Sequence, residues 1–236
     1  MSVARLFVER LPQAGESLRL GAAEASHARA RRLSAGDEVV LFDGSGREAV
    51  ARVVRAARSG IELAAGRPRE AEAAGFPIAL YASAVRAERL AWIAEKATEL
   101  GLSRLILVRT DRTQAFRAGA TLAGRLERVA RAAAKQCGAA RWPEIEGPFP
   151  LSEAFASESA THRILLNAAG EHFPGGLAPG AAALAVGPEG GWTSREMDLA
   201  RGLGWTPARL PAGRLRTETA AIAGLVLLRA ALGASA

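Results

Sequence analysis

An apolar run meets a glycine-rich loop in the stretch Ala182–Trp192, which reads AALAVGPEGGW. The run Ala182–Gly187 is short and wholly apolar, which is typical of a strand buried in a parallel sheet. A helix is expected after the loop, from about Ser194 to Leu203, because Thr193 and Glu196 have the spacing of a capping box. Glycines between such a strand and helix let the backbone approach a ligand at the carboxyl edge of the sheet. The stretch therefore predicts an α/β domain with a binding site at that edge.

The chemistry of this loop limits the classes of ligand that it can bind. Phosphate sites present bare backbone amides and positive charge, whereas Gly187–Gly191 includes the carboxylate of Glu189. The glycine spacing also matches neither the dinucleotide fingerprint nor the P-loop pattern. A ligand with an adenine, a ribose and a positively charged reacting centre fits these residues better than a nucleoside triphosphate. The alternative is a tight turn that needs glycine for its backbone angles alone.

Strand-like and helix-like segments alternate around this loop, from Ile78 to the end of the chain. Short apolar runs predict strands at 78–82, 105–108 and 163–167, and apolar residues at helical spacing predict helices at about 90–100, 122–136 and 218–232. Gly101 is placed to end the first of these helices. This alternation is typical of an α/β domain with a parallel sheet.

The first third of the chain has a different pattern. The apolar run Val39–Phe42 leads into the turn cluster Asp43–Gly46, and alternation resumes from Glu48 to Val54, which predicts a hairpin. Short strands separated by turns suggest a small β-barrel. Pro, Gly, Ala and Glu then replace the apolar pattern between Arg67 and Pro77. We therefore expect two domains, a β-barrel over residues 1–70 and an α/β domain over residues 71–236.

The charge of the chain favours a nucleic-acid partner. Its 236 residues include 31 basic and 24 acidic ones, a net charge of +7, and Lys96 and Lys135 are the only lysines. Arginine is well suited to phosphate and stacked-base contacts, although GC-rich codon usage would produce the same excess.

Other classes of protein are disfavoured by the composition. The single cysteine, Cys137, excludes an internal disulfide and a cysteine-based zinc cluster, and no two of the three histidines have metal-ligand spacing. No metal is therefore expected. The N-terminal residues lack the apolar core of a signal peptide, and the longest apolar run, Ala220–Leu228, is too short to span a membrane. We expect a cytoplasmic protein with no membrane partner.

A second informative stretch is Leu210–Ala221, LPAGRLRTETAA, in which a Pro/Gly loop opens a helix. Thr217 is a suitable N-cap, and Glu218 in the first turn suits the helix dipole. Capping does not explain Arg216, because a cation is unfavourable beside the positive end of a helix. Its position predicts a partner for it, either a buried acid or a ligand.

The GPEGG loop together with LRTETAA resembles the ribosomal RNA small subunit methyltransferase E family, within the SPOUT superfamily of S-adenosylmethionine-dependent methyltransferases. The resemblance extends over essentially the whole chain, through Arg5–Val8, His27–Gly44, Lys96–Gly101 and Asp111-Arg112-Thr113. The chain departs from the family after Gln136, where many members have an arginine two residues on. Arg141 is our candidate to replace it.

The resemblance implies an N-terminal PUA-like RNA-binding barrel and a C-terminal SPOUT domain with a trefoil knot. It also implies a homodimer formed through the SPOUT domain and S-adenosylmethionine as cofactor. The expected substrate is 16S rRNA or the small ribosomal subunit, in which the enzyme methylates N3 of one uridine near the decoding region.

The resemblance also implies the site residues. Arg216 would stabilise the charge that develops on the uracil, and Glu218 would orient that arginine or the substrate, with capping as an equal alternative for Glu218. Three loops would bind the cofactor, through Leu165, Leu166, Asn167, Gly187, Pro188, Glu189, Gly190, Gly191, Leu210, Gly213, Leu215, Arg216, Thr217, Thr219 and Ala220. The candidate RNA-binding residues are Arg5, Arg10, Arg29, Arg31, Arg32 and Arg112.

Three alternatives remain open at this point. A Rossmann-type methyltransferase would need a glycine-rich loop after its first strand, and the residues after Ile78–Ser83 contain none. A non-catalytic RNA-binding factor would be expected to have lost Gly187, Gly190, Gly191 or Arg216. A related enzyme acting on transfer RNA would differ in its N-terminal barrel.

Overall fold

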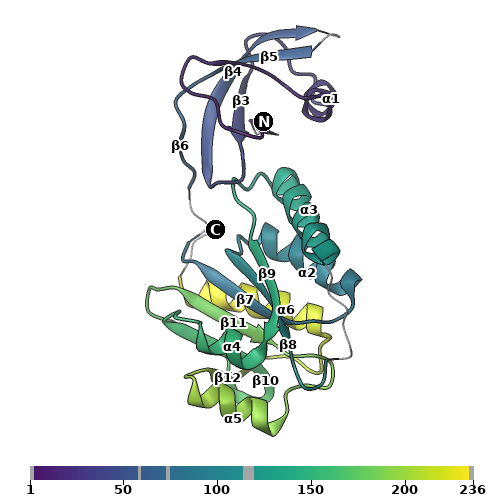
Figure 1. The fold of residues 1–236 in the computed structure, drawn as a ribbon. Coiled ribbons are helices and arrows are strands. Elements are labelled where there is room, and N and C mark those ends of the chain that lie inside the picture. Colours follow the sequence, from purple (N-terminus) through teal and green to yellow (C-terminus); the bar gives the residue numbers. More distant parts are fainter. Residues whose placement is uncertain (1–2, 58–59, 73–74, 114–119, 234–236) are drawn as a thin grey trace. The chain divides into compact units, whose positions relative to one another are not determined.

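The computed structural model describes residues 3–57, 60–72, 75–113 and 120–233. Contacts divide the chain into two compact units, one of residues 1–73 and 134–141 and one of residues 74–133 and 142–236. Each unit has its own sheet and its own hydrophobic core (Figure 1).

The first unit is built on a mixed six-stranded sheet in the order β1-β3-β4-β5-β2, with β6 paired to β4. Its strands are β1 (Ala4–Phe7), β2 (Ser17–Arg19), β3 (Glu38–Phe42), β4 (Arg47–Ala57), β5 (Gly60–Ala65) and β6 (Arg69–Glu70). The predicted hairpin is confirmed, because β3 and β4 pair antiparallel on either side of Asp43–Gly46. Helix α1 (Ala22–Ala30) was not expected. Its sequence has little apolar periodicity, and only Ala25 and Ala28 of this helix are buried.

A later stretch of chain, residues 134–141, belongs to the first unit. Lys135 Nζ lies 2.7 Å from Oε1 of Glu24 in α1 and 4.3 Å from the centre of the Phe7 ring. The carbonyl of Ala140 accepts a hydrogen bond from Gly46 N. The first unit is therefore discontinuous in sequence.

The second unit is an α/β domain with a six-stranded sheet in the order β12-β10-β11-β7-β8-β9, and every pair in it is parallel. Its strands are β7 (Ile78–Ser83), β8 (Arg104–Arg109), β9 (Glu144–Pro150), β10 (His162–His172), β11 (Ala182–Val186) and β12 (Thr206–Arg209). Its helices are α2 (Ala87–Glu99), α3 (Ala120–Cys137), whose last residues join the first unit, α4 (Leu151–Ala156), α5 (Ser194–Gly202) and α6 (Thr217–Ala231). The predicted α/β class with a parallel sheet is confirmed. Strand β9 and helix α4 were missed, because β9 mixes Glu, Gly and Pro with its apolar residues and α4 has only six residues.

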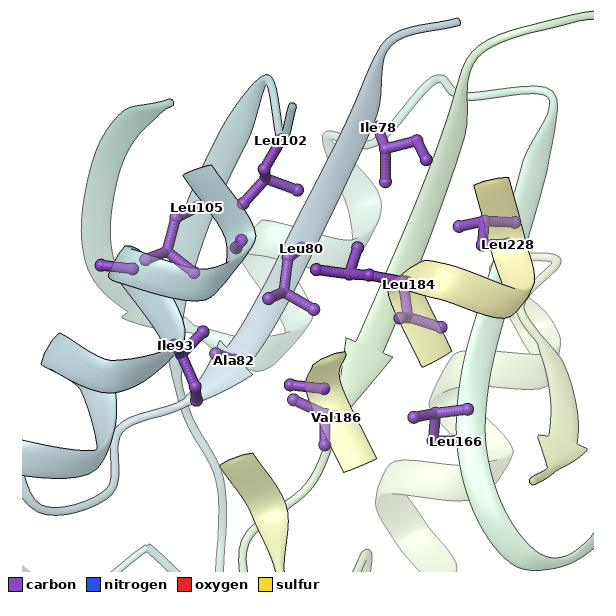
Figure 2. Packing of buried hydrophobic residues seen from close by; sticks show 14 of the residues in the cluster. Ile78, Leu80, Ala82, Ile93, Leu102, Leu105, Leu166, Leu184, Val186 and Leu228 are labelled. Carbon is purple, nitrogen blue, oxygen red and sulfur yellow. The ribbon is translucent and has the colours of Figure 1, made fainter. Parts of the chain in front are cut away.

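Both faces of the central strands are buried, as their continuous apolar sequences predicted. Ile78, Leu80 and Ala82 of β7 point into one core with residues of α2, α3 and α6, whereas Ala79 and Tyr81 point into a second core with residues of α4 and α5. Figure 2 shows the first of these cores, where side chains of α2 and α6 pack against β7 and β11.

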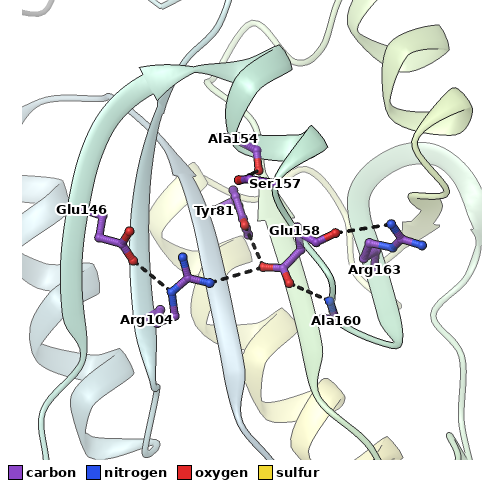
Figure 3. Close-up of polar contacts among 8 residues, drawn as sticks. All are labelled: Tyr81, Arg104, Glu146, Ala154, Ser157, Glu158, Ala160 and Arg163. Carbon is purple, nitrogen blue, oxygen red and sulfur yellow. Dashed lines mark hydrogen bonds and ion pairs between the residues drawn. The ribbon is translucent and has the colours of Figure 1, made fainter.

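A polar network borders the second core. Tyr81 Oη donates a hydrogen bond of 2.7 Å to Oε2 of Glu158, whose other oxygen accepts from Ala160 N at 2.7 Å. Arg104 joins the network between Glu146 and Glu158, at 2.9 Å and 3.7 Å respectively (Figure 3). Every ionised group here has a partner, which is what permits charge next to an apolar core.

The strand order brings β10 together with the segments that follow β11 and β12. Because β10 lies between β11 and β12, these two segments flank it. The trefoil knot expected from the resemblance stays a prediction. Within the described ranges, none of the helices combines the length and apolar character needed to cross a membrane.

Candidate active site

A cavity of about 900 Å³ lies where β11 and β12 end beside β10. Four segments line it, at 166–168 with His172, at 186–192, at 209–215, and in α6 at Thr217 and Ala220. A cavity of this size accommodates a nucleoside-sized ligand.

Most of the predicted cofactor residues lie in the wall of this cavity. Those that line it are Leu166, Asn167, Gly187, Pro188, Glu189, Gly190, Gly191, Leu210, Gly213, Leu215, Thr217 and Ala220. Three predicted residues do not line it. Leu165 is fully buried in the second core, and the side chains of Arg216 and Thr219 are exposed.

Trp192 organises the loop that carries the glycines. Its indole Nε1 donates a hydrogen bond of 2.9 Å to the carbonyl of Leu166, which links the loop to β10. A Cβ atom on Gly187 would lie 2.9 Å from the indole, so this glycine is needed for the close approach of Trp192. Gly191 has φ +70, a left-handed conformation that favours glycine.

The start of α6 differs from the expectation. The N-cap is Arg216, and Thr217 is the first helical residue. The predicted capping role of Thr217 is therefore wrong. Its hydroxyl instead donates a hydrogen bond of 3.0 Å to the carbonyl of Gly187, so it joins the start of α6 to the glycine loop.

Arg89 of α2 is a site residue that the sequence analysis missed. Its Nη1 pairs with Glu189 Oε1, and its Nε lies 3.8 Å from Oε2 of Glu218. The signal was present in the sequence, because Arg89 is a cation directly before the helix expected at about 90–100. That is the argument that singled out Arg216. In the part of the chain that the structure describes, the Arg216 side chain makes no hydrogen bond or ion pair.

A second missed feature is a pair of polar side chains at one end of the cavity. Arg209 Nη2 donates to His172 Nε2 at 2.6 Å, and both residues line the cavity. A guanidinium can only donate, so this nitrogen of His172 carries no proton in this arrangement. With Arg214 and Glu189, these are the ionisable side chains among the described lining residues.

The segment after β8 also contacts the glycine loop. Arg112, expected to bind RNA, donates from Nη1 to the carbonyl of Gly190. Asp111 N donates to Glu196 Oε1 at 2.8 Å, and Thr193 Oγ1 donates to Asp111 Oδ2 at 3.0 Å. The guanidinium of Arg112 therefore lies beside the cavity rather than on the first unit.

The other RNA candidates lie in the first unit and differ in their availability. Arg5 is paired with Glu48 at 2.9 Å, and Arg10 with Glu16 at 2.8 Å. Burial raises the pKa of Glu48, but hydrogen bonds from Arg5 and Arg69 outweigh it and hold the pKa below its usual value. In contrast, the exposed candidates without such pairing among the described residues are Arg29, Arg31 and Arg32.

Arg141, the candidate replacement for the missing arginine, packs on a turn of the first unit. Its Nη2 donates to Ser45 O at 3.3 Å, and its guanidinium occupies the space that a Cβ on Gly46 would need. These contacts give it a structural role in that turn.

Comparisons with known proteins assign both parts of the chain. Residues 72–229 match a family described as an RNA methyltransferase domain, and residues 20–64 match one described as an RNA methyltransferase PUA domain. The α/β domain with its preceding mixed sheet, and the cavity at the edge of the parallel sheet, thus define an RNA methyltransferase.

Individual relatives narrow the family. The ribosomal RNA small subunit methyltransferase E of Mycobacterium bovis is 32% identical over 94% of this chain and 90% of its own, and that of Mycobacterium tuberculosis gives the same values. A Legionella pneumophila protein described as a methyltransferase, solved with the cofactor SAM bound, is 26% identical with a TM-score of 0.81 over 98% of both chains. A probable rRNA-methyltransferase of Porphyromonas gingivalis is also 26% identical, with a TM-score of 0.81 over 98% of this chain and 99% of its own. The chain belongs to the ribosomal RNA small subunit methyltransferase E family.

Proposed function

We propose that this protein transfers the methyl group of S-adenosylmethionine to N3 of one uridine of 16S rRNA in the cytoplasm. The observation that carries the proposal is the cavity itself. The two most specific motifs of the sequence, GPEGG and RTET, meet at its wall through the hydrogen bond from Thr217 to Gly187.

The residues of the cavity fit this cofactor. Gly190, Gly191 and Gly213 line the cavity without side chains, so a ligand can approach the backbone there, and Leu166 and Leu215 supply apolar walls. Glu189 is the carboxylate among the described lining residues, which suits a cationic ligand. When bound, S-adenosylmethionine supplies an electrophilic methyl group. The fifteen residues predicted to bind it include three outside the lining, Leu165, Arg216 and Thr219. We propose that these act through the backbone or at the rim.

The chain's own residues have two tasks in the reaction. They hold the acceptor nitrogen in line with the methyl donor, because correct orientation of the reacting atoms lowers the barrier strongly. They also stabilise the anion of the weakly acidic imide. A bond forms between N3 and the methyl carbon, the carbon–sulfur bond breaks, and the N3 proton passes to solvent. We assign the second task to Arg216, which lies in the chain between the cavity residues Leu215 and Thr217 and whose exposed side chain is not engaged by a described side chain. Glu218 is paired with Arg89, so its contribution is positional.

The variant Arg216→Ala tests this assignment. We expect turnover to fall by at least about 100-fold, the usual cost of removing one preorganised charge-stabilising group, while the calorimetric affinity for S-adenosylmethionine stays within about twofold. Arg125→Ala, at another exposed arginine of the second unit that does not line the cavity, is the matched control. Unchanged turnover in Arg216→Ala would remove Arg216 from the mechanism.

The substrate is tested with methyl-labelled cofactor. Purified protein is incubated separately with naked 16S rRNA, assembled small subunits and transfer RNA, and the labelled nucleoside is identified by mass spectrometry. We expect N3-methyluridine at a single position of 16S rRNA. Label in transfer RNA would support a related enzyme of different specificity, and cofactor binding without transfer to any RNA would support a non-catalytic binding factor.

We propose a homodimer through the second unit. Helices α2 and α6 contact each other, and they expose the large apolar side chains Trp92 (40%) and Val226 (48%). Such side chains are commonly covered in an interface. Light scattering of the wild type should give twice the chain mass, and the variant Trp92→Glu/Val226→Glu should give the monomer.

A further inference from the structure

Arg89 occupies an unfavourable position in its own helix. It lies in the first turn of α2, which begins at Ala87 after the N-cap Arg86, and the helix dipole disfavours a cation there. Its side chain is only 27% exposed, so water offsets little of this cost. Glu88 adds negative charge to the same turn, but the largely buried guanidinium still needs an anionic partner beside it.

Glu218 is one such partner and depends on Arg89 in return. This residue lies in the first turn of α6, and its side chain is 14% exposed. Its Oε2 is buried with no hydrogen-bond partner, and Arg89 Nε lies 3.8 Å away. A carboxylate removed from water needs a cation beside it, and Arg89 provides one.

Glu189 completes the cluster from the cavity side. Its Oε1 pairs with Arg89 Nη1, and its side chain is 52% exposed in the cavity wall. The ion pair therefore ties a half-exposed carboxylate of the cavity wall to Arg89, and the exposed part of Glu189 stays available to a bound molecule.

We propose that Arg89 is a positioning residue of the cofactor site. It holds Glu189, and with it the loop Gly187–Gly191, against the first turn of α6. Without Arg89, the two carboxylates would share a partly buried region with no cation between them, and their repulsion would displace the loop. This inference rests on the proposed function for the identity of the ligand, S-adenosylmethionine.

A double-mutant cycle on cofactor affinity tests the link between Arg89 and Glu189. We expect Arg89→Met and Glu189→Gln each to weaken calorimetric binding of S-adenosylmethionine about tenfold, and the double variant to bind no more weakly than the weaker single variant. A loss of affinity of about 100-fold in the double variant, the product of the two single losses, would overturn the proposal. Unchanged binding in Arg89→Met would also overturn it. Arg86→Met, three residues earlier and exposed, is the matched control and should bind like the wild type.

A second variant separates positioning from a purely structural role. Arg89→Met/Glu218→Gln removes the cation together with the buried carboxylate that it compensates. We expect the melting temperature lost in Arg89→Met to be largely recovered, while cofactor affinity stays about tenfold weaker because Glu189 is still not held. Recovery of both would show that Arg89 only stabilises the fold. Arg89→Lys, which keeps the charge but not the planar fork, should bind with intermediate affinity.

Hydrogen exchange of the ligand-free proteins makes the test independent of the ligand. The amides of Gly187–Trp192 should exchange at least about fivefold faster in Arg89→Met than in the wild type or in Arg86→Met. Equal exchange would overturn the positioning role. Failure of the wild type to bind S-adenosylmethionine would instead contradict the proposed function, and the exchange result would still decide the role of Arg89.

Discussion

The Gly187–Trp192 contact shows how one missing side chain sets the geometry of the cavity. The indole of Trp192 is held by its hydrogen bond to Leu166, so it cannot retreat from a new Cβ without breaking that bond. From the sequence alone, this glycine predicts the close approach of a ligand. The structure gives the protein's own indole as a sufficient reason for Gly187, which leaves the ligand argument to Gly190 and Gly191.

The first prediction concerns this contact. Gly187→Ala should lower the free energy of unfolding by about 1–3 kcal/mol, the usual cost of overpacking, in chemical denaturation. In a Trp192→Leu background the same substitution should cost markedly less, because the clashing ring is absent. An equal cost in both backgrounds would mean that the backbone of Gly187, and not the indole, imposes the requirement.

Tyr81 is the only tyrosine of the chain. Burial raises the pKa of its phenol, and the hydrogen bond to Glu158 raises it further. Because the folded-state pKa is above the unfolded value, the folded protein favours the neutral phenol. The resulting stability is complete below the ordinary tyrosine pKa, about 10, and is lost as pH rises toward the folded-state value.

Wild type should therefore lose stability with rising pH above about pH 10 more steeply than Tyr81→Phe. Thermal unfolding at a series of alkaline pH values measures this, and phenolate absorbance of the single tyrosine reports its ionisation directly. A folded protein whose phenolate forms near pH 10 would contradict the prediction.

Helix α5 shows which contacts the sequence could predict and which it could not. The capping box of Thr193 and Glu196 is confirmed, since each side chain bonds the other residue's backbone. Residues three apart suffice for that prediction. The hydrogen bond from Asp111 to the other oxygen of Glu196 joins segments far apart in the chain, and local pattern carries no information on it. Local pattern likewise singled out Glu189 and Glu218 but carried no information on their pairing with Arg89, which lies far from both in the chain.

The cap of α5 gives a prediction at this scale. Thr193→Ala should lower the free energy of unfolding by about 1–2 kcal/mol, since it removes the acceptor for Glu196 N. Thr193→Ser retains the hydroxyl and should lower the free energy of unfolding by only a few tenths of a kcal/mol. Urea unfolding of both variants measures the difference. Equal losses would indicate that the threonine methyl group, rather than the cap, stabilises the helix.

For the whole molecule, the sequence pattern predicted the second unit far better than the first. Apolar runs buried on both faces, such as Ala182–Val186, are a strong signal, and all four predicted strands of the parallel sheet are present. The first unit includes residues 134–141, held by contacts such as Lys135 with Glu24. No local periodicity in the sequence predicts that residues 134–141 belong to the first unit. Arg5 illustrates a similar limit, because its position in a basic sequence gave no sign of its pairing with Glu48.

We expect the exposed arginines near the end of α1 to contact RNA phosphates, and the salt dependence of binding tests this. Arg29, Arg31 and Arg32 are exposed near the end of α1. Replacing all three with Gln should weaken binding of a 16S rRNA fragment and make the dependence of log affinity on log salt shallower by roughly one for each phosphate that the protein no longer neutralises. Fluorescence anisotropy over a salt series measures the slope. The control variant neutralises Arg52, which is paired with Glu38, together with Arg55 and Arg67, all also exposed on the same unit, and it should leave the slope close to the wild-type value. If both triple variants shift the slope equally, binding depends on overall charge and not on the end of α1.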